Sequence, residues 1–274
     1  MAARRSKRAA SGAAPIITFT TDFGTRDPFV GIMKGVILGA APAARLVDLT
    51  HEVPPQNVVA GAYALASAAP WFPARTIHVA VVDPGVGTRR RALLIETADA
   101  WFVGPDNGVL SLAVPARAMR RIFDVSRSRV RLRPTSRTFH GRDVFAPVAA
   151  ALAAGEDPAT LGTSIRTIER LRPPAARRRS GRVFGQVLWA DRYGNLTTNV
   201  GRAELESAGF RGRRLSTTIG AHVVPFRASY GSVRPDRAVA VVNSSDLLEI
   251  AVNHGSAAER FGAGPGTRIS VGVD

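Results

Sequence analysis

Short apolar runs alternate with stretches of helical periodicity in the first part of the chain. Residues 16–20, 45–49 and 77–82 are apolar and β-branched, as in strands buried within a sheet. Residues 27–40 and 56–69 lie between them and are expected to be helices. This alternation of strand and helix predicts a mainly parallel sheet joined by right-handed crossovers.

The first of these helices has a recognisable start. Asp27 is the expected N-cap and Pro28 the expected first helical residue, because proline lacks the N–H that would be unsatisfied there. Apolar side chains then recur at helical spacing. The residues expected to be buried are Phe29, Ile32, Met33, Val36 and Ile37.

Further elements continue the same domain. Residues 92–96 and 100–103 are predicted to be a pair of strands, followed by a short helix at 109–114. A strand is expected at 119–125 and a longer helix at 144–154. Together with the preceding elements, they predict an α/β domain.

The pattern changes after residue 158. Short strands separated by turn residues then predominate, and only residues 203–208 look helical. The predicted strands are 181–189, 215–219, 221–226, 238–243, 247–252 and 267–271. This pattern of short strands and turns predicts a smaller all-β domain, either a sandwich or a barrel.

These patterns divide the chain into four parts. Residues 1–14 are expected to be a disordered basic tail, 15–170 an α/β N-terminal domain, 171–180 a linker and 181–274 a β-barrel C-terminal domain. No apolar run reaches the ~18 residues that a membrane span needs. The tail also lacks the apolar core of a secretory signal, so we expect a cytoplasmic protein without a membrane partner.

Composition narrows the possible functions. The chain has no cysteine, which excludes disulfides and thiolate chemistry. The net charge of +16 suggests nucleic-acid binding. However, all except two of the 37 basic residues are arginines, and most of them are scattered along the chain. Denser groups occur in the tail and at residues 117–137 and 177–179, without interleaved aromatic residues. A solvated basic surface is favoured, and no nucleic-acid partner is predicted.

One predicted strand of the N-terminal domain is followed by residues that can bind a ligand or take part in catalysis. Asp83 follows the run 77–82, and Pro84, Gly85 and Gly87 then allow a tight turn and close approach of a ligand. Ligands of open α/β sheets lie beyond the carboxyl ends of strands, where Asp83 is placed. Taken alone, the segment is equally compatible with a structural turn.

Several kinds of site are not indicated. The five histidines lack metal-ligand spacing, and the chain has no Gly-x-Ser-x-Gly elbow, P-loop or dinucleotide fingerprint. We therefore predict no metal site and no NAD or FAD. Asp83, an arginine six or seven residues later and His140 remain, and such a set can hold and polarise a water molecule. On this basis the candidates are hydrolases or lyases of a small polar ligand.

Two segments of the C-terminal domain are also polar. One runs from Asp191 to Asn195 and the other from Asn243 to Asn253. Asp and Asn are common in turns because their side chains bond to their own backbone. The residues alone therefore favour a structural role.

Six motifs in order along the chain resemble one enzyme family, the S-adenosyl-L-methionine (SAM) hydroxide adenosyltransferases, or adenosine-forming SAM hydrolases. The family is related to the SAM-dependent fluorinase and chlorinase. The resemblance covers residues 16–274. The motifs are Thr20-Thr21-Asp22-Phe23-Gly24, Val82-Asp83-Pro84-Gly85-Val86-Gly87-Thr88, Gly104-Pro105-Asp106-Asn107-Gly108, Phe139-His140-Gly141-Arg142-Asp143, Asp191-x-Tyr193-Gly194-Asn195 and the Asn243 to Asn253 segment.

The resemblance implies both an architecture and a reaction. It implies an α/β N-terminal and a β-barrel C-terminal domain, and a homotrimer in which SAM binds between the N-terminal domain of one subunit and the C-terminal domain of its neighbour. Water would attack the ribose C5′ and release L-methionine, leaving adenosine. The sulfonium is already activated, so SAM is the substrate and no cofactor is expected.

The resemblance also implies roles for individual residues. Asp83, Arg90 and His140 match the set around the attacking water, with Arg90 selected by the family's Asp-to-Arg spacing. Asp22 matches the carboxylate that binds the ribose hydroxyls. The other expected substrate-binding residues are Asn107, Asp191, Asn195, Ser244, Glu249 and the backbone of Val252. Asp191 matches a position near the methionine amino group in the halogenases.

This chain departs from the pattern at two positions. Gln56 stands where the halogenating relatives carry Trp, and Asp246 where many members have Gly, which affects the expected shape of the pocket. Two alternative functions are a SAM-dependent halogenase that uses chloride and a non-catalytic adenosine- or SAM-binding protein. The complete Asp83, Arg90 and His140 set favours water over a halide, because a halide needs no base.

Overall fold

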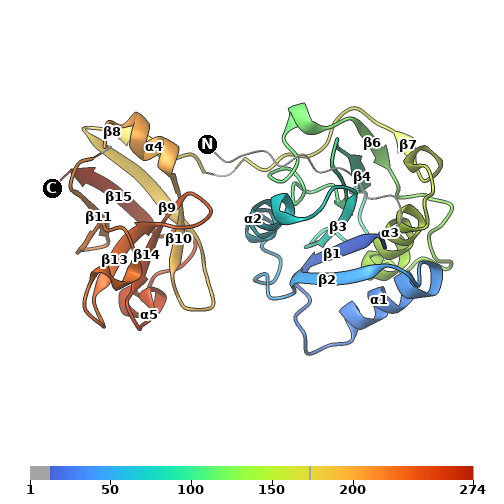
Figure 1. The fold of residues 1–274 in the computed structure, drawn as a ribbon, viewed down its shortest axis with the longest axis horizontal. Coiled ribbons are helices and arrows are strands. Elements are labelled where there is room, and N and C mark those ends of the chain that lie inside the picture. Colours follow the sequence, from blue (N-terminus) through green and yellow to red (C-terminus); the bar gives the residue numbers. More distant parts are fainter. Residues whose placement is uncertain (1–12, 173, 211, 274) are drawn as a thin grey trace. The chain divides into compact units, whose positions relative to one another are not determined.

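The computed structural model describes residues 13–172, 174–210 and 212–273, and the chain divides into two compact units between Leu171 and Arg172 (Figure 1). Each unit has a hydrophobic core of its own. Most of the predicted basic tail, residues 1–12, lies outside the described residues. No described helix is long and apolar enough to cross a membrane.

Unit 1 is built on a seven-stranded sheet of order β2-β1-β3-β5-β4-β6-β7. Strands β2, β1, β3 and β5 are parallel neighbours, and β4 pairs antiparallel with β5 and with β6. The mainly parallel sheet is therefore confirmed. The strands are β1 Ile16–Thr21, β2 Arg45–Thr50, β3 Thr76–Val81, β4 Ala92–Glu96, β5 Ala100–Pro105, β6 Arg121–Asp124 and β7 Thr163–Ser164.

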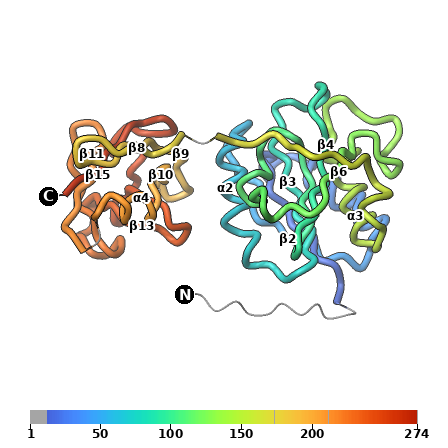
Figure 2. Tube along the Cα trace, turned by 90° about the horizontal axis from the view of Figure 1, so that it is seen from above, coloured from blue at the N-terminus to red at the C-terminus, as the bar shows by residue number. Residues whose placement is uncertain are grey.

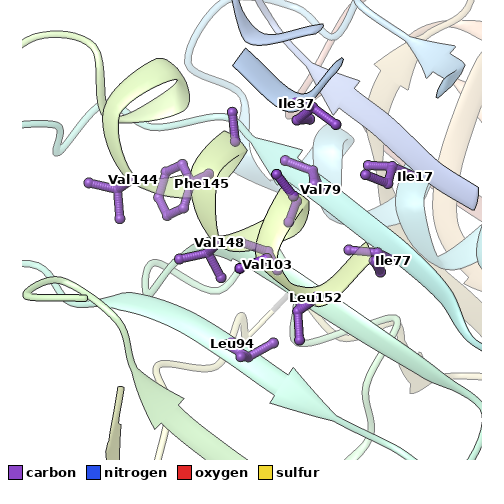
Figure 3. Packing of buried hydrophobic residues seen from close by; sticks show 14 of the residues in the cluster. Ile17, Ile37, Ile77, Val79, Leu94, Val103, Val144, Phe145, Val148 and Leu152 are labelled. Carbon is purple, nitrogen blue, oxygen red and sulfur yellow. The ribbon is translucent and has the colours of Figure 1, made fainter. Parts of the chain in front are cut away.

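Helices cover both faces of this sheet (Figure 1). Side chains alternate between the faces of a strand, and Ile17, Ile77 and Val79 point to the face covered by α1 (Phe29–Ala40) and α3 (Ala146–Ala153) (Figure 3). Helix α2 (Val58–Ala68) packs on the opposite face, where a Cβ on Gly61 would lie 2.8 Å from Val82. Burial of each large aliphatic side chain in this core contributes about 1.5–3 kcal/mol.

The connections place a crevice between β1 and β3. The chain passes from β1 through α1 to β2 on one side of β1, and then through α2 to β3 on its other side. A reversal of strand order opens a crevice at the carboxyl ends of the two central strands. Asp22 directly follows β1, and Asp83 comes shortly after β3, so both residues lie at this edge.

Unit 2 is an antiparallel sheet curved into a nearly closed barrel, of order β12-β11-β15-β9-β10-β14-β13. A bridge from Phe226 to Ala240 joins the chain after β12 to β13. The predicted all-β, barrel-like fold is confirmed. The elements are β8 Arg177–Arg179, β9 Arg182–Ala190, β10 Leu196–Gly201, α4 Arg202–Ser207, β11 Leu215–Ile219, β12 His222–Pro225, β13 Ala238–Val242, β14 Leu247–Val252, α5 Ala257–Phe261 and β15 Arg268–Val273.

The segment before unit 2 is extended and bonded to unit 1. Residues 165–171 run along this unit after β7, where Glu169 donates its N–H to Asp106 at 2.7 Å and Leu171 donates to Ser111 at 3.1 Å (Figure 2). Within the stretch predicted to be a linker, Arg177–Arg179 forms strand β8 and pairs with β9. The pairing is a tertiary contact, which the arginine-rich composition does not reveal.

Several local predictions about unit 1 were wrong. Asp27 does not cap α1; Pro28 occupies the cap position without a side-chain hydrogen bond. Phe29 and Ile32 are exposed, Phe29 because it lines a cavity. Residues 109–114 form turns instead of a helix, because the Asn107 side chain accepts the Val109 N–H and the Ser111 hydroxyl donates to the Gly108 carbonyl.

Besides β8, two elements of unit 2 were not predicted, and one helix of unit 1 begins irregularly. Strand β10 was not predicted because it is rich in polar threonines. These threonines are buried, and Thr197 donates to Glu249 while Thr198 donates to the Leu248 carbonyl. Helix α5, whose N-cap Ser256 accepts the Glu259 N–H, was also missed. Before α3, Gly141–Phe145 forms a π turn in which the Ala146 N–H reaches the Gly141 carbonyl.

Candidate active site

A cavity of about 380 Å³ opens at the crevice between β1 and β3. Its polar side chains come from four separate segments and include Asp22, Gln56, Asp83 and His140. Apolar walls are formed mainly by Phe23, Phe29, Pro84, Val86 and Phe139. A mostly apolar cavity with a few convergent polar groups is the usual form of a small-molecule site.

A two-point ion pair fixes the orientation of Asp83. Its side chain is 4% exposed and that of Arg90 is 9% exposed. Arg90 Nε donates to Asp83 Oδ1 at 3.0 Å, and Nη2 donates to Oδ2. The planar guanidinium thus binds both carboxylate oxygens and neutralises a charge that would otherwise be buried alone.

The turn after Asp83 folds back and brings Arg90 to the carboxylate. The Val86 N–H bonds to the Asp83 carbonyl at 3.2 Å, and the Thr88 hydroxyl bonds to the Gly85 carbonyl at 2.7 Å. Gly87 adopts φ 76°, and a Cβ there would lie 2.2 Å from the Arg137 carbonyl oxygen. Only glycine fits both the backbone angle and this close approach.

The three consecutive arginines have different environments. Arg89 is exposed, whereas Arg91 pairs with the buried Asp106 and donates to the Thr167 carbonyl at 3.0 Å. Only Arg90 contacts Asp83 among the three. The structure therefore places Arg90 at this position, as the spacing argument expected.

His140 joins the same network through its ring. Arg90 Nη2 lies 2.8 Å from His140 Nδ1, and because a guanidinium only donates, Nδ1 must be the unprotonated acceptor. Burial and then the charge of Arg90 lower the pKa of His140 below its ordinary value, outweighing Asp83 and Asp143. Neutral His140 therefore carries its proton on Nε2.

The segment after His140 is tightly packed. A Cβ on Gly141 would lie 2.9 Å from Met33 Sδ, so the π turn sits directly on α1. Phe145, at the end of this turn, has its ring centre 5.4 Å from the Arg90 guanidinium carbon. The core of unit 1 and the site are thus connected by consecutive residues.

Asp22 lies in the same cavity and has one oxygen engaged by the backbone. Its Oδ2 accepts the Gln56 N–H at 2.8 Å, and Gln56 is held at φ 63°. Its Oδ1 accepts no hydrogen bond from the part of the chain that the structure describes. Of the residues expected at the site, the structure brings Asp22, Asp83, Arg90 and His140 together.

Asn107 is placed differently. Its amide donates to the Val82 carbonyl at 2.8 Å and its oxygen accepts the Val109 N–H at 3.1 Å, and it does not line the cavity. Both ends of the side chain are therefore used within unit 1. Asn107 holds the backbone next to Asp83 in place.

In unit 2, Asp191 and Asn195 close one turn. Asp191 Oδ1 accepts the backbone N–H groups of Tyr193 at 2.8 Å and Asn195 at 2.9 Å, and Oδ2 accepts the Asn195 amide at 3.1 Å. Gly194 is packed against Ser256, whose Oγ would lie 2.1 Å from a Cβ on this residue. The structure thus shows the turn role that the residues alone favoured.

Glu249 is the centre of a second polar cluster in unit 2. It is 4% exposed and accepts hydrogen bonds from Tyr230 at 2.7 Å, Asn243 at 2.9 Å and Thr197 at 3.2 Å. Burial and the Glu249 carboxylate raise the pKa of Tyr230, which therefore remains a donor. Tyr230 was not among the predicted residues because it lies far from the motifs in sequence.

Ser244 and Val252 flank this cluster. Ser244 follows Asn243 in the turn before β14, and Val252 ends that strand with its carbonyl accepting the Gly255 N–H at 3.0 Å.

Among the described residues of the chain, no group of His, Asp and Glu is arranged to hold a metal ion.

Comparison with known proteins decides the family. The model of the SAM hydroxide adenosyltransferase N-terminal domain matches residues 17–162, and the model of its C-terminal domain matches residues 185–270. This chain belongs to the SAM hydroxide adenosyltransferase family. The match extends across both units and includes the segments that carry Asp22, Asp83, Arg90 and His140.

Individual relatives agree with this family assignment. The chain is 41% identical over 261 residues to the (R)-S-adenosyl-L-methionine hydrolase of Thermus thermophilus, covering 92% of this chain and 98% of the relative. A fluorinase of Actinopolyspora mzabensis is 27% identical, with 94% and 97% covered. A solved structure of a conserved protein from Thermotoga maritima matches with a TM-score of 0.86 and 32% identity, over 93% of this chain and 99% of that one.

Proposed function

We propose that this protein hydrolyses SAM to adenosine and L-methionine. The observation that carries the proposal is the Asp83–Arg90–His140 network at a cavity that also contains Asp22. Relatives at about 40% identity over nearly their full length are named as hydrolases of (R)-SAM. The proposal therefore includes preference for the R configuration at the sulfonium.

In the proposed reaction, a water oxygen forms a bond to the ribose C5′ while the bond from C5′ to sulfur breaks. The bonding electrons go to sulfur, which leaves as the neutral thioether of methionine. The water proton goes to His140 Nδ1 after water replaces Arg90 at this acceptor, and then to solvent. The adjacent Arg90 charge favours release of that proton.

Asp83 and Arg90 act through position and charge in this scheme. The carboxylate is held by Arg90 and accepts a hydrogen bond from the water, which orients the oxygen toward C5′. Apolar side chains such as Val86 and Phe139 limit hydration of the reacting pair. No cofactor or metal is needed in this proposal, because the positive charge of the sulfonium already makes the thioether a good leaving group.

Substrate binding is assigned to both units. Asp22 Oδ1 would accept the ribose hydroxyls, with Oδ2 held by Gln56. In unit 2, Asn195, Ser244, Glu249 and the Val252 backbone would hold the adenine and its surroundings, and Asp191 would lie near the methionine amino group. All of these assignments rest on the family resemblance, and that of Asp22 is also supported by its place in the cavity.

The direct test is incubation of the purified protein with (R)- and (S)-SAM, followed by chromatography of the products. Adenosine and L-methionine in equal amounts, formed faster from the R epimer, are the expected result. A parallel reaction contains chloride. Formation of 5′-chloro-5′-deoxyadenosine would favour a halogenase instead, and bound SAM without any product would favour the non-catalytic binding function.

The proposal also includes a cytoplasmic homotrimer in which a site combines unit 1 of one subunit with unit 2 of its neighbour. The test is complementation between two inactive variants, His140→Ala in unit 1 and Glu249→Ala in unit 2. Co-expressed chains should recover part of the activity, because some mixed sites contain neither substitution. Failure of properly folded mixed trimers to recover activity would contradict shared sites.

A further inference from the structure

A second cavity, of about 270 Å³, lies beside the candidate active site and is not used in the proposed reaction. Its walls come from the turn after β3 and from the arginine-rich stretch of residues 117–137. His140 lines both cavities, whereas Asp22 and Asp83 line only the first and Arg90 only the second. The second cavity is therefore separate from the substrate cavity but shares a wall with it.

The charged side chains around this cavity are all positive. Four of them are arginines, Arg90, Arg127, Arg131 and Arg137, and none is a carboxylate. Arg90 is neutralised by Asp83, but Arg127, Arg131 and Arg137 form no ion pair with any carboxylate among the described residues. Elsewhere in unit 1, Arg91, Arg121, Arg129 and Arg142 each have such a partner.

Three hydroxyl groups around the cavity are used in other hydrogen bonds, so the guanidinium groups are the main donors left for a ligand. The Thr88 and Thr135 hydroxyls donate to the Gly85 and Leu132 carbonyls, both at 2.7 Å. The Ser126 hydroxyl donates to Asp124 at 2.6 Å. Arg131 donates from Nη1 to the Ser126 carbonyl at 3.1 Å, but its Nε is buried and bonded to no described residue.

The cavity is built by tight contacts between its two walls. The Arg137 carbonyl sits so close to Gly87 that a Cβ on the glycine would clash with it at 2.2 Å. The Ser136 N–H is fixed by Asp143 at 2.7 Å, on the same segment as Arg137. Arg127 and Arg137 are exposed, so an ion from solvent can reach them.

We propose that this cavity binds a small tetrahedral oxyanion of the phosphate or sulfate class. Guanidinium groups match such oxygens in geometry and charge, and unpaired arginines around one cavity lower the cost of bringing the anion in. The volume far exceeds the roughly 30 Å³ that one water molecule takes up in the liquid. A bound anion would lie next to Arg90 and His140, and so beside the proposed catalytic network.

The test measures binding of inorganic phosphate to the full-length protein by calorimetry, at constant ionic strength and pH. Substituting Arg127→Gln or Arg137→Gln should weaken binding about tenfold each, as expected for loss of one charge-assisted hydrogen bond. Arg133→Gln is the matched control, because Arg133 is exposed in the same stretch but does not line the cavity. It should leave binding unchanged.

A second measurement locates the anion. The chain has five histidines, and phosphate at fixed pH should shift the imidazole NMR signals of His140, identified with His140→Gln, without shifting those of His222. No binding, binding no tighter than chloride, or equal weakening by all three arginine substitutions would overturn the proposal. Neither measurement involves SAM turnover, so the result is independent of the proposed reaction.

Discussion

Each unit buries one carboxylate in its polar cluster, but the two are stabilised in different ways. Asp83 in unit 1 is held by the cation Arg90, which also bonds to His140. Glu249 in unit 2 accepts hydrogen bonds from Tyr230, Asn243 and Thr197, all of them neutral. Both carboxyl groups are largely shielded from solvent, and they differ in the charge of their partners.

This difference in partners makes one cluster suited to proton transfer and the other suited to ligand binding. A carboxylate, a cation and an imidazole in contact can redistribute a proton, because a charge change at one is compensated by the others. A carboxylate surrounded by neutral donors holds a fixed pattern of acceptors, which suits orientation of a ligand or of the barrel itself. In the proposed function, unit 1 accordingly carries out the reaction and unit 2 binds the adenine end.

The largest effect is expected from His140→Gln. Loss of the proton acceptor should reduce SAM turnover about 10²–10⁴-fold, the usual contribution of a positioned acid or base. His222→Gln is the control, since His222 is exposed on β12 in unit 2. Steady-state kinetics of both variants provide the measurement. Similar activity in the two variants would remove His140 from the mechanism.

A second experiment compares the two carboxylates directly through Asp83→Asn and Glu249→Gln. The first leaves Arg90 buried opposite a neutral group and should lower the free energy of unfolding by about 3 kcal/mol. The second leaves no cation unpaired and should cost about 1 kcal/mol. Urea unfolding of the full chain, monitored separately for each unit, measures both. Equal losses would mean that the partners do not distinguish the two clusters.

Two glycines offer a comparison of backbone geometry. Gly87 in unit 1 and Gly220 in unit 2 both have positive φ, 76° and 55°, but only Gly87 has a backbone atom against its Cβ position. Gly220→Ala should cost about 1 kcal/mol from conformational strain, and Gly87→Ala at least about 2 kcal/mol. Thermal unfolding checks the stabilities. A smaller loss for Gly87→Ala would show that the turn shifts easily.

The smallest effect concerns pH. Because the pKa of His140 lies below the ordinary value of 6.5, the ring stays mainly neutral at pH 6.5. Between pH 8 and 6.5 kcat/KM should change less than about twofold, and it should fall at lower pH as His140 becomes protonated. The stability linked to neutral His140 is likewise fully present above pH 6.5 and is lost as pH falls. An apparent pKa above 6.5 would contradict this environment.

Much of the framework follows from local sequence patterns. The buried run that becomes β3 and the Pro-Gly turn after Asp83 are sufficient to predict a residue at the carboxyl edge of a sheet. The alternation of strands and helices then predicts that Asp22 lies at the same edge. His140 and an arginine shortly after Asp83 were candidates from the residues alone, but the choice of Arg90 required the family motif. The contact between Arg90 and His140 spans 50 residues, and no local pattern encodes it.

Other features depend on partners that a linear pattern does not show. Tyr230 and Glu249 meet through the barrel, and the different environments of Arg89, Arg90 and Arg91 depend on Asp83 and Asp106. The second cavity depends on which arginines of a long basic stretch face the turn at Gly87. The composition of that stretch shows that it is basic, but it does not show which of the guanidinium groups face the cavity.

The π turn at Gly141–Phe145 makes the site sensitive to chain length as well as to side-chain identity. A π turn contains one residue more than an α-helical turn. Deletion of one residue here would let the hydrogen bonds return to the α-helical pattern and rotate His140 by about 100° relative to α3. The core could remain intact while the imidazole left Arg90. Loops elsewhere can vary in length, but an insertion or deletion between His140 and α3 would disrupt the site even in a protein that still folds.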